Sequence, residues 1–243
     1  MSLNKLTLAL SLALFALPMA AMAQDAAEET AAEEAPAAEE AESNFSWNLS
    51  FTSDYVFRGV SQNLREPAVQ AGMDYSFGDT GFYVGTWGSN IDFGAGGPDL
   101  EVDTYIGWNH DISDDWNFDL MLTRYNYLGA ENAYGNINYS EVVGVVTWSE
   151  MIAATLAYTD DYSNSGISST YFSVTGTWEI GNEFSLNAGA GVTSFEGGGD
   201  YNDWNLGISR QFGPVNAAIN YYDTDIAGPQ VSDGFVLTFA FGG

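Results

Sequence analysis

The chain has no cysteine, few cationic side chains and a single histidine. The absence of cysteine excludes a disulfide-stabilised scaffold and any thiolate chemistry. Lysine and arginine together number 5, against 33 aspartates and glutamates. A surface so acidic repels nucleic acid and anionic substrates and attracts cations. We therefore expect no nucleic-acid partner.

These shortages also argue against an enzyme. The one histidine is His110, and lysine is absent after Lys5, so general-base catalysis would fall to carboxylates. Paired carboxylates can hydrolyse glycosidic bonds, but no fixed spacing of them supports such a pair here. Acidic clusters such as Asp160-Asp161 do not have the spacing of a calcium loop. The sequence predicts no catalytic residues, no metal ligands and no cofactor.

The sequence also lacks any apolar run long enough for a membrane helix. The longest, Leu6–Leu17, follows Lys5 and precedes the small-residue site Ala21-Met22-Ala23, which is the pattern of a cleaved secretory signal. We predict a signal peptide over residues 1–23 and export to a bacterial periplasm. Residues 24–43 are rich in alanine and glutamate, with no large apolar side chain to bury. They are predicted to form a disordered periplasmic spacer, with a contact to a basic partner as the alternative.

From residue 44 to residue 243 the chain alternates apolar and polar residues in about a dozen runs of roughly ten residues. Alternation places successive side chains on opposite faces of a strand, and ten tilted residues span the hydrocarbon layer of a membrane. The pattern predicts an all-β fold, an antiparallel transmembrane β-barrel of about 12 strands. The predicted strands are Ser46–Phe57, Pro67–Phe77, Phe82–Asp92, Leu100–Asn109, Trp116–Tyr125, Asn138–Trp148, Met151–Thr159, Thr170–Ile180, Phe184–Phe195, Tyr201–Phe212, Val215–Asp223 and Gly234–Phe241.

Two further patterns orient this barrel. Five short and six long connections alternate strictly, which predicts that both termini lie on the short-connection, periplasmic side. Aromatic residues gather at the strand ends, as they do in the girdles of membrane barrels. We predict a ring at the short-connection end from Trp47, Trp108, Trp116, Trp148 and Trp178, and a second ring at the opposite rim from Tyr55, Tyr125, Tyr139, Tyr158, Tyr171 and Tyr221. On the third strand Tyr83, Trp87 and Ile91 are assigned to the lipid side, whereas the sixth strand is apolar on both faces and its orientation stays open.

The opposite face of the strands is polar or small and should line the lumen. Eight of the 33 acidic residues fall between Gln24 and Ser43, so the barrel has 25 against four arginines, a formal charge of −21. A wet acidic pore in a low-dielectric wall concentrates cations. The candidates for a constriction are Asp54, Arg58, Asp74, Asp103 and Asp119, with Asp203 also on the lumen side and Arg58 as a partner for one of these aspartates.

Part of the sequence resembles a known family. The segments Ser53–Gln62 (SDYVFRGVSQ), Pro67–Gly72, Gly81–Asn90 and Leu100–Asp103 are similar to the opening of the TorF family, the Gcw_chp domain. The resemblance is specific over residues 53–109 and diffuse afterwards, and the acidic tail before Asn44 is outside it. It implies an outer-membrane barrel classed as a porin, and it brings no established binding or catalytic residues.

The sequence thus predicts a porin-like channel of the outer membrane, through which small hydrophilic solutes or cations diffuse passively. Outer-membrane lipids and lipopolysaccharide are its expected surroundings. The alternative is a structural or surface-interaction barrel in which aspartates and arginine pair across a plugged lumen and the acidic loops bind cations. A soluble periplasmic β-protein is disfavoured, because large apolar side chains would then be exposed on every strand. The transported solute, oligomeric state and gating are not predicted.

Overall fold

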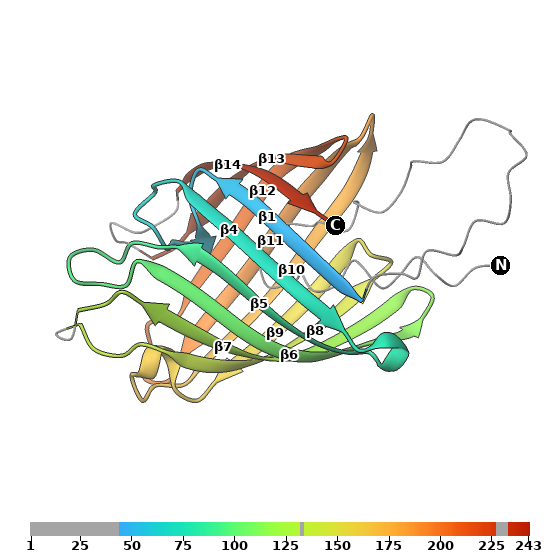
Figure 1. Cartoon of the computed structure of the whole chain (residues 1–243). Helices are drawn as coiled ribbons and strands as arrows, with labels where there is room; N and C mark the ends of the chain where they lie inside the picture. Colours follow the sequence, from blue (N-terminus) through green and yellow to red (C-terminus); the bar gives the residue numbers. More distant parts are fainter. Residues whose placement is uncertain (1–43, 132–133, 227–232) are drawn as a thin grey trace, which may run out of the picture.

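The computed structural model describes residues 44–131, 134–226 and 233–243, and within them twelve strands form one closed antiparallel barrel (Figure 1). The predicted fold is confirmed. The predicted signal peptide and acidic tail lie outside the described residues. The barrel strands are β1 (Phe45–Thr52), β4 (Ala68–Ser76), β5 (Phe82–Asn90), β6 (Leu100–Ser113), β7 (Trp116–Leu128), β8 (Tyr139–Trp148), β9 (Ile152–Thr159), β10 (Ser169–Gly181), β11 (Phe184–Phe195), β12 (Tyr201–Phe212), β13 (Val215–Thr224) and β14 (Gly234–Gly242).

Each barrel strand pairs with its neighbours in the chain, and β1 closes the barrel by pairing with both β4 and β14. Connections 77–81, 114–115, 149–151, 182–183 and 213–214 are short and share one end of the barrel, and the remaining, longer connections share the other. The predicted alternation is therefore present. We call these two ends the short-connection end and the long-connection end.

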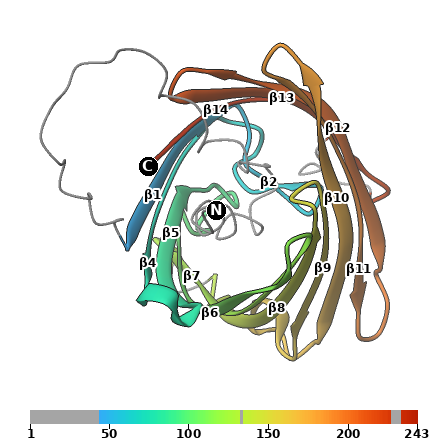
Figure 2. The ribbon, with the colours of Figure 1, turned by 90° about the vertical axis from the view of Figure 1, so that its right-hand side faces the viewer.

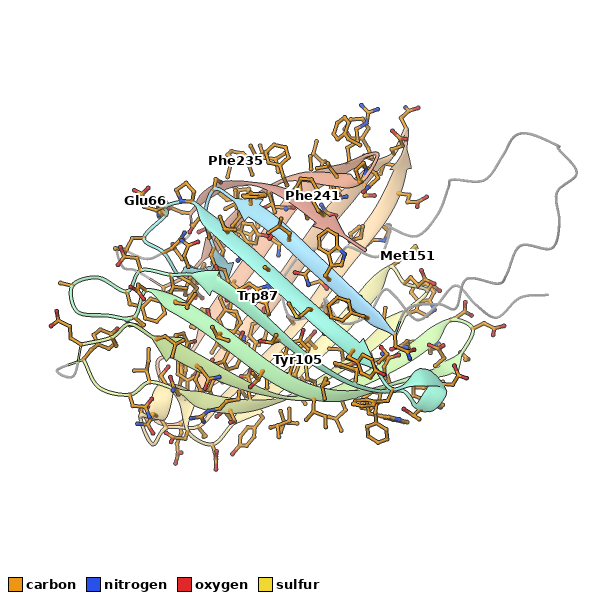
Figure 3. The ribbon with its side chains drawn as sticks, viewed as in Figure 1. Glu66, Trp87, Tyr105, Met151, Phe235 and Phe241 are labelled. Atoms are coloured by element: carbon orange, nitrogen blue, oxygen red, sulfur yellow. The ribbon has the colours of Figure 1, made fainter. Side chains whose placement is uncertain are left out.

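The outer surface of the barrel is apolar. Large hydrophobic side chains such as Leu122 on β7, Leu156 on β9 and Leu206 on β12 are exposed, and Phe235 projects from the outside with 73% of its surface exposed (Figure 3). Trp47, Trp116, Trp148 and Trp178 are exposed at the short-connection end, whereas Trp108 stacks on His110 with their ring centroids 5.1 Å apart. Such a belt is typical of a barrel wall that faces lipid.

The first predicted strand, Ser46–Phe57, is too long. Strand β1 ends at Thr52, after which the chain turns into the barrel, so that Tyr55 is buried rather than facing outward. The turn inward is stabilised locally, because the Ser61 hydroxyl donates to Asp54 (2.7 Å) and the Tyr55 amide donates to Asn63 (3.0 Å). These bonds replace the ladder that a longer β1 would have made with β4 and β14.

The predicted facing is wrong on the third strand and for three tyrosines. On β5 the outward positions are taken by Phe82, Val84, Thr86 and Gly88, so Tyr83, Trp87 and Ile91 are buried inside. Tyr125, Tyr139 and Tyr171 also lie inside, where they pack with other aromatic rings, whereas Tyr158 is exposed as predicted and Tyr221 packs with the exposed rings of Trp204 and Phe235. On β8, whose facing the sequence left open, Val142 is exposed while Val143 and Val145 are buried inside.

Two short 3₁₀ turns, Gly78–Thr80 and Tyr162–Asn164, are the helical segments among the described residues. Within that part of the chain no helix is long and apolar enough to span a membrane.

Candidate functional site: the lumen hairpin and its carboxylates

A small hairpin enters the barrel between β1 and β4. Strands β2 (Val56–Phe57) and β3 (Val60–Ser61) pair with each other and lie inside the ring of barrel strands (Figure 2). The two residues at its tip, Arg58 and Gly59, have φ of 50° and 78°, as a two-residue type I′ turn requires. A Cβ atom on Gly59 would lie 2.7 Å from Cβ of Asp203 and 3.0 Å from Cβ of Thr224. The tip therefore presses on β12 and β13.

The hairpin is tied to the far wall by one ion pair. Arg58 donates Nη1 to Oε1 of Glu141 (3.0 Å) and Nη2 to Oε2 (2.7 Å), a bidentate arrangement. The side chains are 6% and 0% exposed. The Tyr125 hydroxyl also donates to Glu141 (3.1 Å), and the guanidinium lies 4.4 Å from the ring centre of Tyr171. The ring centre of Phe57 also lies 4.5 Å from the guanidinium. The buried guanidinium thus has one carboxylate as its counter-charge and two aromatic rings in contact.

Aromatic rings surround this ion pair on the long-connection side. Successive ring centroids are 6.2, 4.6, 5.0, 5.2 and 6.3 Å apart along an arc that crosses from the hairpin to β12. The arc consists of Phe57, Tyr125, Tyr139, Tyr162, Phe195 and Tyr201.

Elsewhere on the inner wall, tyrosines lie across glycines to reach carboxylates. Tyr105 on β6 and Asp74 on β4 are both register partners of Gly85 on β5, and the Tyr105 hydroxyl donates to Asp74 over 2.7 Å. A Cβ atom on Gly85 would overlap both the tyrosine ring and the carboxylate. The glycine therefore makes the space that lets the ring lie against the wall. Tyr105 and Trp87 come from neighbouring strands of this wall (Figure 3).

A similar arrangement occurs twice more, although in each of these only one of the tyrosine and the aspartate is a register partner of the glycine. Tyr83 lies over Gly107 and donates to Asp119 at 2.9 and 3.0 Å, and Asn109 also donates to Asp119 (3.3 Å). Tyr171 lies over Gly191 and donates to Asp203 (3.4 Å). We call these three units the Tyr–Gly–Asp bridges: Tyr105–Gly85–Asp74, Tyr83–Gly107–Asp119 and Tyr171–Gly191–Asp203.

The five predicted lumen residues all lie on the inside, but each has different surroundings. Asp54 bonds Ser61 at the base of the hairpin, Asp74 and Asp119 belong to Tyr–Gly–Asp bridges, and Asp103 is fully buried. The predicted aspartate partner of Arg58 is wrong, because its partner is Glu141. Glu141 could not be identified from the sequence, because β8 has valines on both faces and its pattern does not show which face points inward.

At the long-connection end, one exposed carboxylate binds the neighbouring strand. Asp225 accepts the backbone N–H of Asn202 (2.7 Å) and its side-chain Nδ2 (2.6 Å), and these bonds lower the pKa of Asp225 below its ordinary value. In the described ranges, no group of three or more histidine, aspartate or glutamate side chains is arranged to hold a metal ion.

The protein is thus a closed antiparallel barrel of twelve strands. Its exterior is apolar, its interior is polar, and a short hairpin enters it. The chain belongs to the family described as "Bacterial protein of unknown function (Gcw_chp)", whose model matches residues 36–236. The match begins within the acidic tail, which the sequence resemblance had placed outside the pattern. No curated protein matches the chain.

Solved structures with a similar fold are barrels from membranes. One, solved in work on the in-meso crystallization of membrane proteins, has a TM-score of 0.56 at 8% identity and covers 82% of this chain and 83% of that one. The NanC porin has a TM-score of 0.48 at 9% identity, covering 82% and 97%. The KdgM porin, in complex with oligogalacturonate, has a TM-score of 0.46 at 6% identity, covering 82% and 95%. Identities this low establish a shared fold alone.

Proposed function

We propose that this barrel is a porin-like channel of the bacterial outer membrane, through which small hydrophilic solutes diffuse passively and cations are favoured. The observation that carries the proposal is the division of the wall into two faces. Leucine, phenylalanine and tryptophan are exposed outside, whereas aspartate, asparagine, serine and threonine face inward on the same strands. A soluble protein would bury these large apolar side chains, whereas a barrel in a membrane exposes them to lipid.

The topology supports one orientation in the membrane. A signal peptide over residues 1–23 would export the chain, and the short-connection end, with both ends of the barrel and residues 24–43, would face the periplasm. The apolar belt would contact outer-membrane lipids, and the long connections would meet lipopolysaccharide.

The cation preference rests on the charges inside. Among the described residues, Arg58 is the one arginine that enters the lumen, and Glu141 neutralises it. Asp54, Asp74 and Asp119 then leave a negative field, which a low-dielectric wall strengthens. We assign the constriction to the lumen around the hairpin, where Asp54, Asp103 and Arg58 lie, with Asp74 and Asp119 nearer the short-connection end.

Single-channel recording in planar bilayers tests this function. Under a gradient of dilute KCl, the wild-type protein should conduct. Its reversal potential should indicate a higher permeability for K⁺ than for Cl⁻. Asp74→Asn and Asp119→Asn should each reduce that preference, because the amide keeps the size of the side chain and removes its charge. Asp114→Asn, in the short connection 114–115, is the matched control and should leave the preference unchanged. A wild-type preference for Cl⁻ would contradict the proposal.

A second candidate is favoured by the hairpin itself. The buried Arg58–Glu141 pair and the aromatic arc occupy the long-connection side of the lumen, as a plug would. The protein would then be a structural or surface-interaction barrel whose acidic loops bind cations. In that case the wild-type protein does not conduct, replacing residues 56–61 by a short glycine linker creates conductance, and deleting a long connection abolishes cell-surface contacts without changing permeability.

A further inference from the structure

Strand β6 carries two buried carboxylates whose missing hydrogen-bond partners the channel proposal does not explain. Glu101 and Asp103 are two residues apart and face the lumen side by side, with 2% and 0% of their surfaces exposed. Glu101 pairs in register with Ser89 and Tyr127, and Asp103 pairs with Trp87 and Tyr125. The pair therefore sits in the half of the barrel wall that the hairpin covers.

Three of the four oxygens of these two carboxylates lack hydrogen-bond partners among the described residues, as Oδ2 of Asp203 also does. Within the described part of the chain, neither oxygen of Asp103 has a hydrogen-bond partner, and the same holds for Oε2 of Glu101. None of these three oxygens is in contact with solvent. Asp74 and Asp119, by contrast, accept hydrogen bonds from tyrosine hydroxyls. Three buried oxygens without a hydrogen-bond donor from the described residues are a deficit, since buried polar atoms in folded proteins are almost always satisfied.

None of the arginines in the described part of the chain corrects this deficit. The ion pairs found among the described residues use Arg58, Arg65 and Arg210, each with another carboxylate, and Arg124 lies on the outer face where it contacts Ser140. The charges of Glu101 and Asp103 repel each other. A buried carboxylate in this position has to take up a proton, take up a cation, or rearrange.

The surroundings suit a bound cation. The hydroxyls of Tyr55 and Tyr127 hydrogen-bond Glu101, which leaves its second oxygen free on the same face as Asp103. Tyr55 packs edge-on against Trp87, with their ring centroids 5.4 Å apart, and both rings belong to the buried cluster around the pair. Aromatic rings and hydroxyls thus enclose two carboxyl groups, with oxygen as the ligand atom.

We propose that Glu101 and Asp103 together bind one divalent, oxygen-preferring cation of the Ca²⁺ class inside the barrel. Two carboxylates match its charge, and hard divalent cations take carboxylate oxygen in preference to nitrogen or sulfur. The pair offers three free oxygens, fewer than the six to eight that Ca²⁺ takes, so water or hydroxyl groups complete the shell. The cation would fasten β6 beneath the hairpin. The proposal goes beyond the channel function and does not require conduction.

The test is thermal unfolding of the full chain folded in detergent micelles, in CaCl₂ and in EDTA. A cation that binds only the folded protein stabilises it, so the wild-type Tm should be several degrees higher in CaCl₂ than in EDTA. Asp103→Asn and Glu101→Gln should each abolish that difference. Asp119→Asn is the matched control, because its carboxylate already has tyrosine and asparagine partners, and it should keep the wild-type difference.

Direct binding to the wild-type protein gives a second measurement that does not depend on the variants folding. Equilibrium dialysis of the wild-type protein with radioactive Ca²⁺ should show one site per chain. An equal Tm in CaCl₂ and EDTA, with Asp103→Asn more stable than wild type in both, would show a protonated carboxyl and overturn the proposal. A Ca²⁺ effect that survives both substitutions would place the ion at the loops and also overturn it. Conductance of the same preparation is measured separately, so that failure of the channel function leaves the Tm difference unchanged.

Discussion

Tyr105 donates a hydrogen bond of 2.7 Å to Asp74 across the strand that separates them, and it does so over Gly85. The ring lies against the wall instead of standing in the lumen, and the carboxylate is held in a fixed position. Three such bridges keep large aromatic side chains from filling the interior of a narrow barrel. Their glycines are therefore as important to the lumen as the charged residues.

Replacing Gly85 by alanine should disrupt its bridge. The added Cβ overlaps the Tyr105 ring and Asp74, so the ring has to move toward the lumen. We expect a loss of about 1–3 kcal/mol in unfolding free energy, as for overpacking in other cores, together with a lower conductance. Urea unfolding in micelles and bilayer recording measure the two effects. Gly144→Ala is the control, because its nearest neighbour would be the Leu156 carbonyl oxygen at 4.0 Å.

Removing the positive charge of Arg58 should destabilise the barrel strongly. Arg58→Ala leaves Glu141 buried without its counter-charge, which typically costs about 3–5 kcal/mol of unfolding free energy. The double variant Arg58→Met with Glu141→Leu should recover most of that loss. Arg65→Ala provides the comparison, since its ion pair with Asp233 is exposed and worth about 0–1 kcal/mol. Equal losses of unfolding free energy in the two single variants would show that the buried ion pair contributes no more to stability than the exposed one.

The tip of the hairpin should be sensitive to one added methyl group. Gly59 has a φ of 78° and faces Asp203 and Thr224 closely, whereas Gly94 has a φ of 87° and open space around the position that an added Cβ would take. Alanine at either position meets the same backbone strain, about 1 kcal/mol or slightly more. Gly59→Ala should also displace the hairpin from β12 and β13. Conductance should therefore change in Gly59→Ala and not in Gly94→Ala, and a matching change in both would contradict the packing of the tip.

The contact between Asp225 and Asn202 should respond to acid. Its hydrogen bonds lower the pKa of Asp225 below the ordinary value of 3.8. A carboxyl whose pKa is lower in the folded state stabilises it above the unfolded pKa, and that contribution is lost as the pH falls through the folded value. Hydrogen exchange should find the Asn202 amide protected at neutral pH and progressively unprotected below the ordinary aspartate pKa. In Asp225→Asn this acid transition should be absent.

Much of this fold could be predicted from the sequence, because alternation is a local signal. The strands, the alternating connections and the inward side of Asp74, Asp103 and Asp119 follow from period two alone. The hairpin could not be predicted in the same way, because Tyr55 and Phe57 continue the alternation of β1 although the chain has already turned inward.

The partners inside the barrel are harder to predict for a related reason. Arg58 and Glu141 are 83 positions apart, and each Tyr–Gly–Asp bridge joins three strands. Alternation gives two faces without saying which one is inside when both carry aromatic or aliphatic residues, as on β5 and β8. Only the placement of neighbouring strands in space shows that a glycine lies beneath each tyrosine.

The seam of the barrel has a consequence for its assembly. Strands β1 and β14 close the sheet through pairs from Asn48–Gly242 to Thr52–Thr238, and they come from opposite ends of the barrel sequence. In every other neighbouring pair, the two barrel strands follow one another in the sequence. The circle therefore cannot close before β14, the last barrel strand in the sequence, has been synthesised.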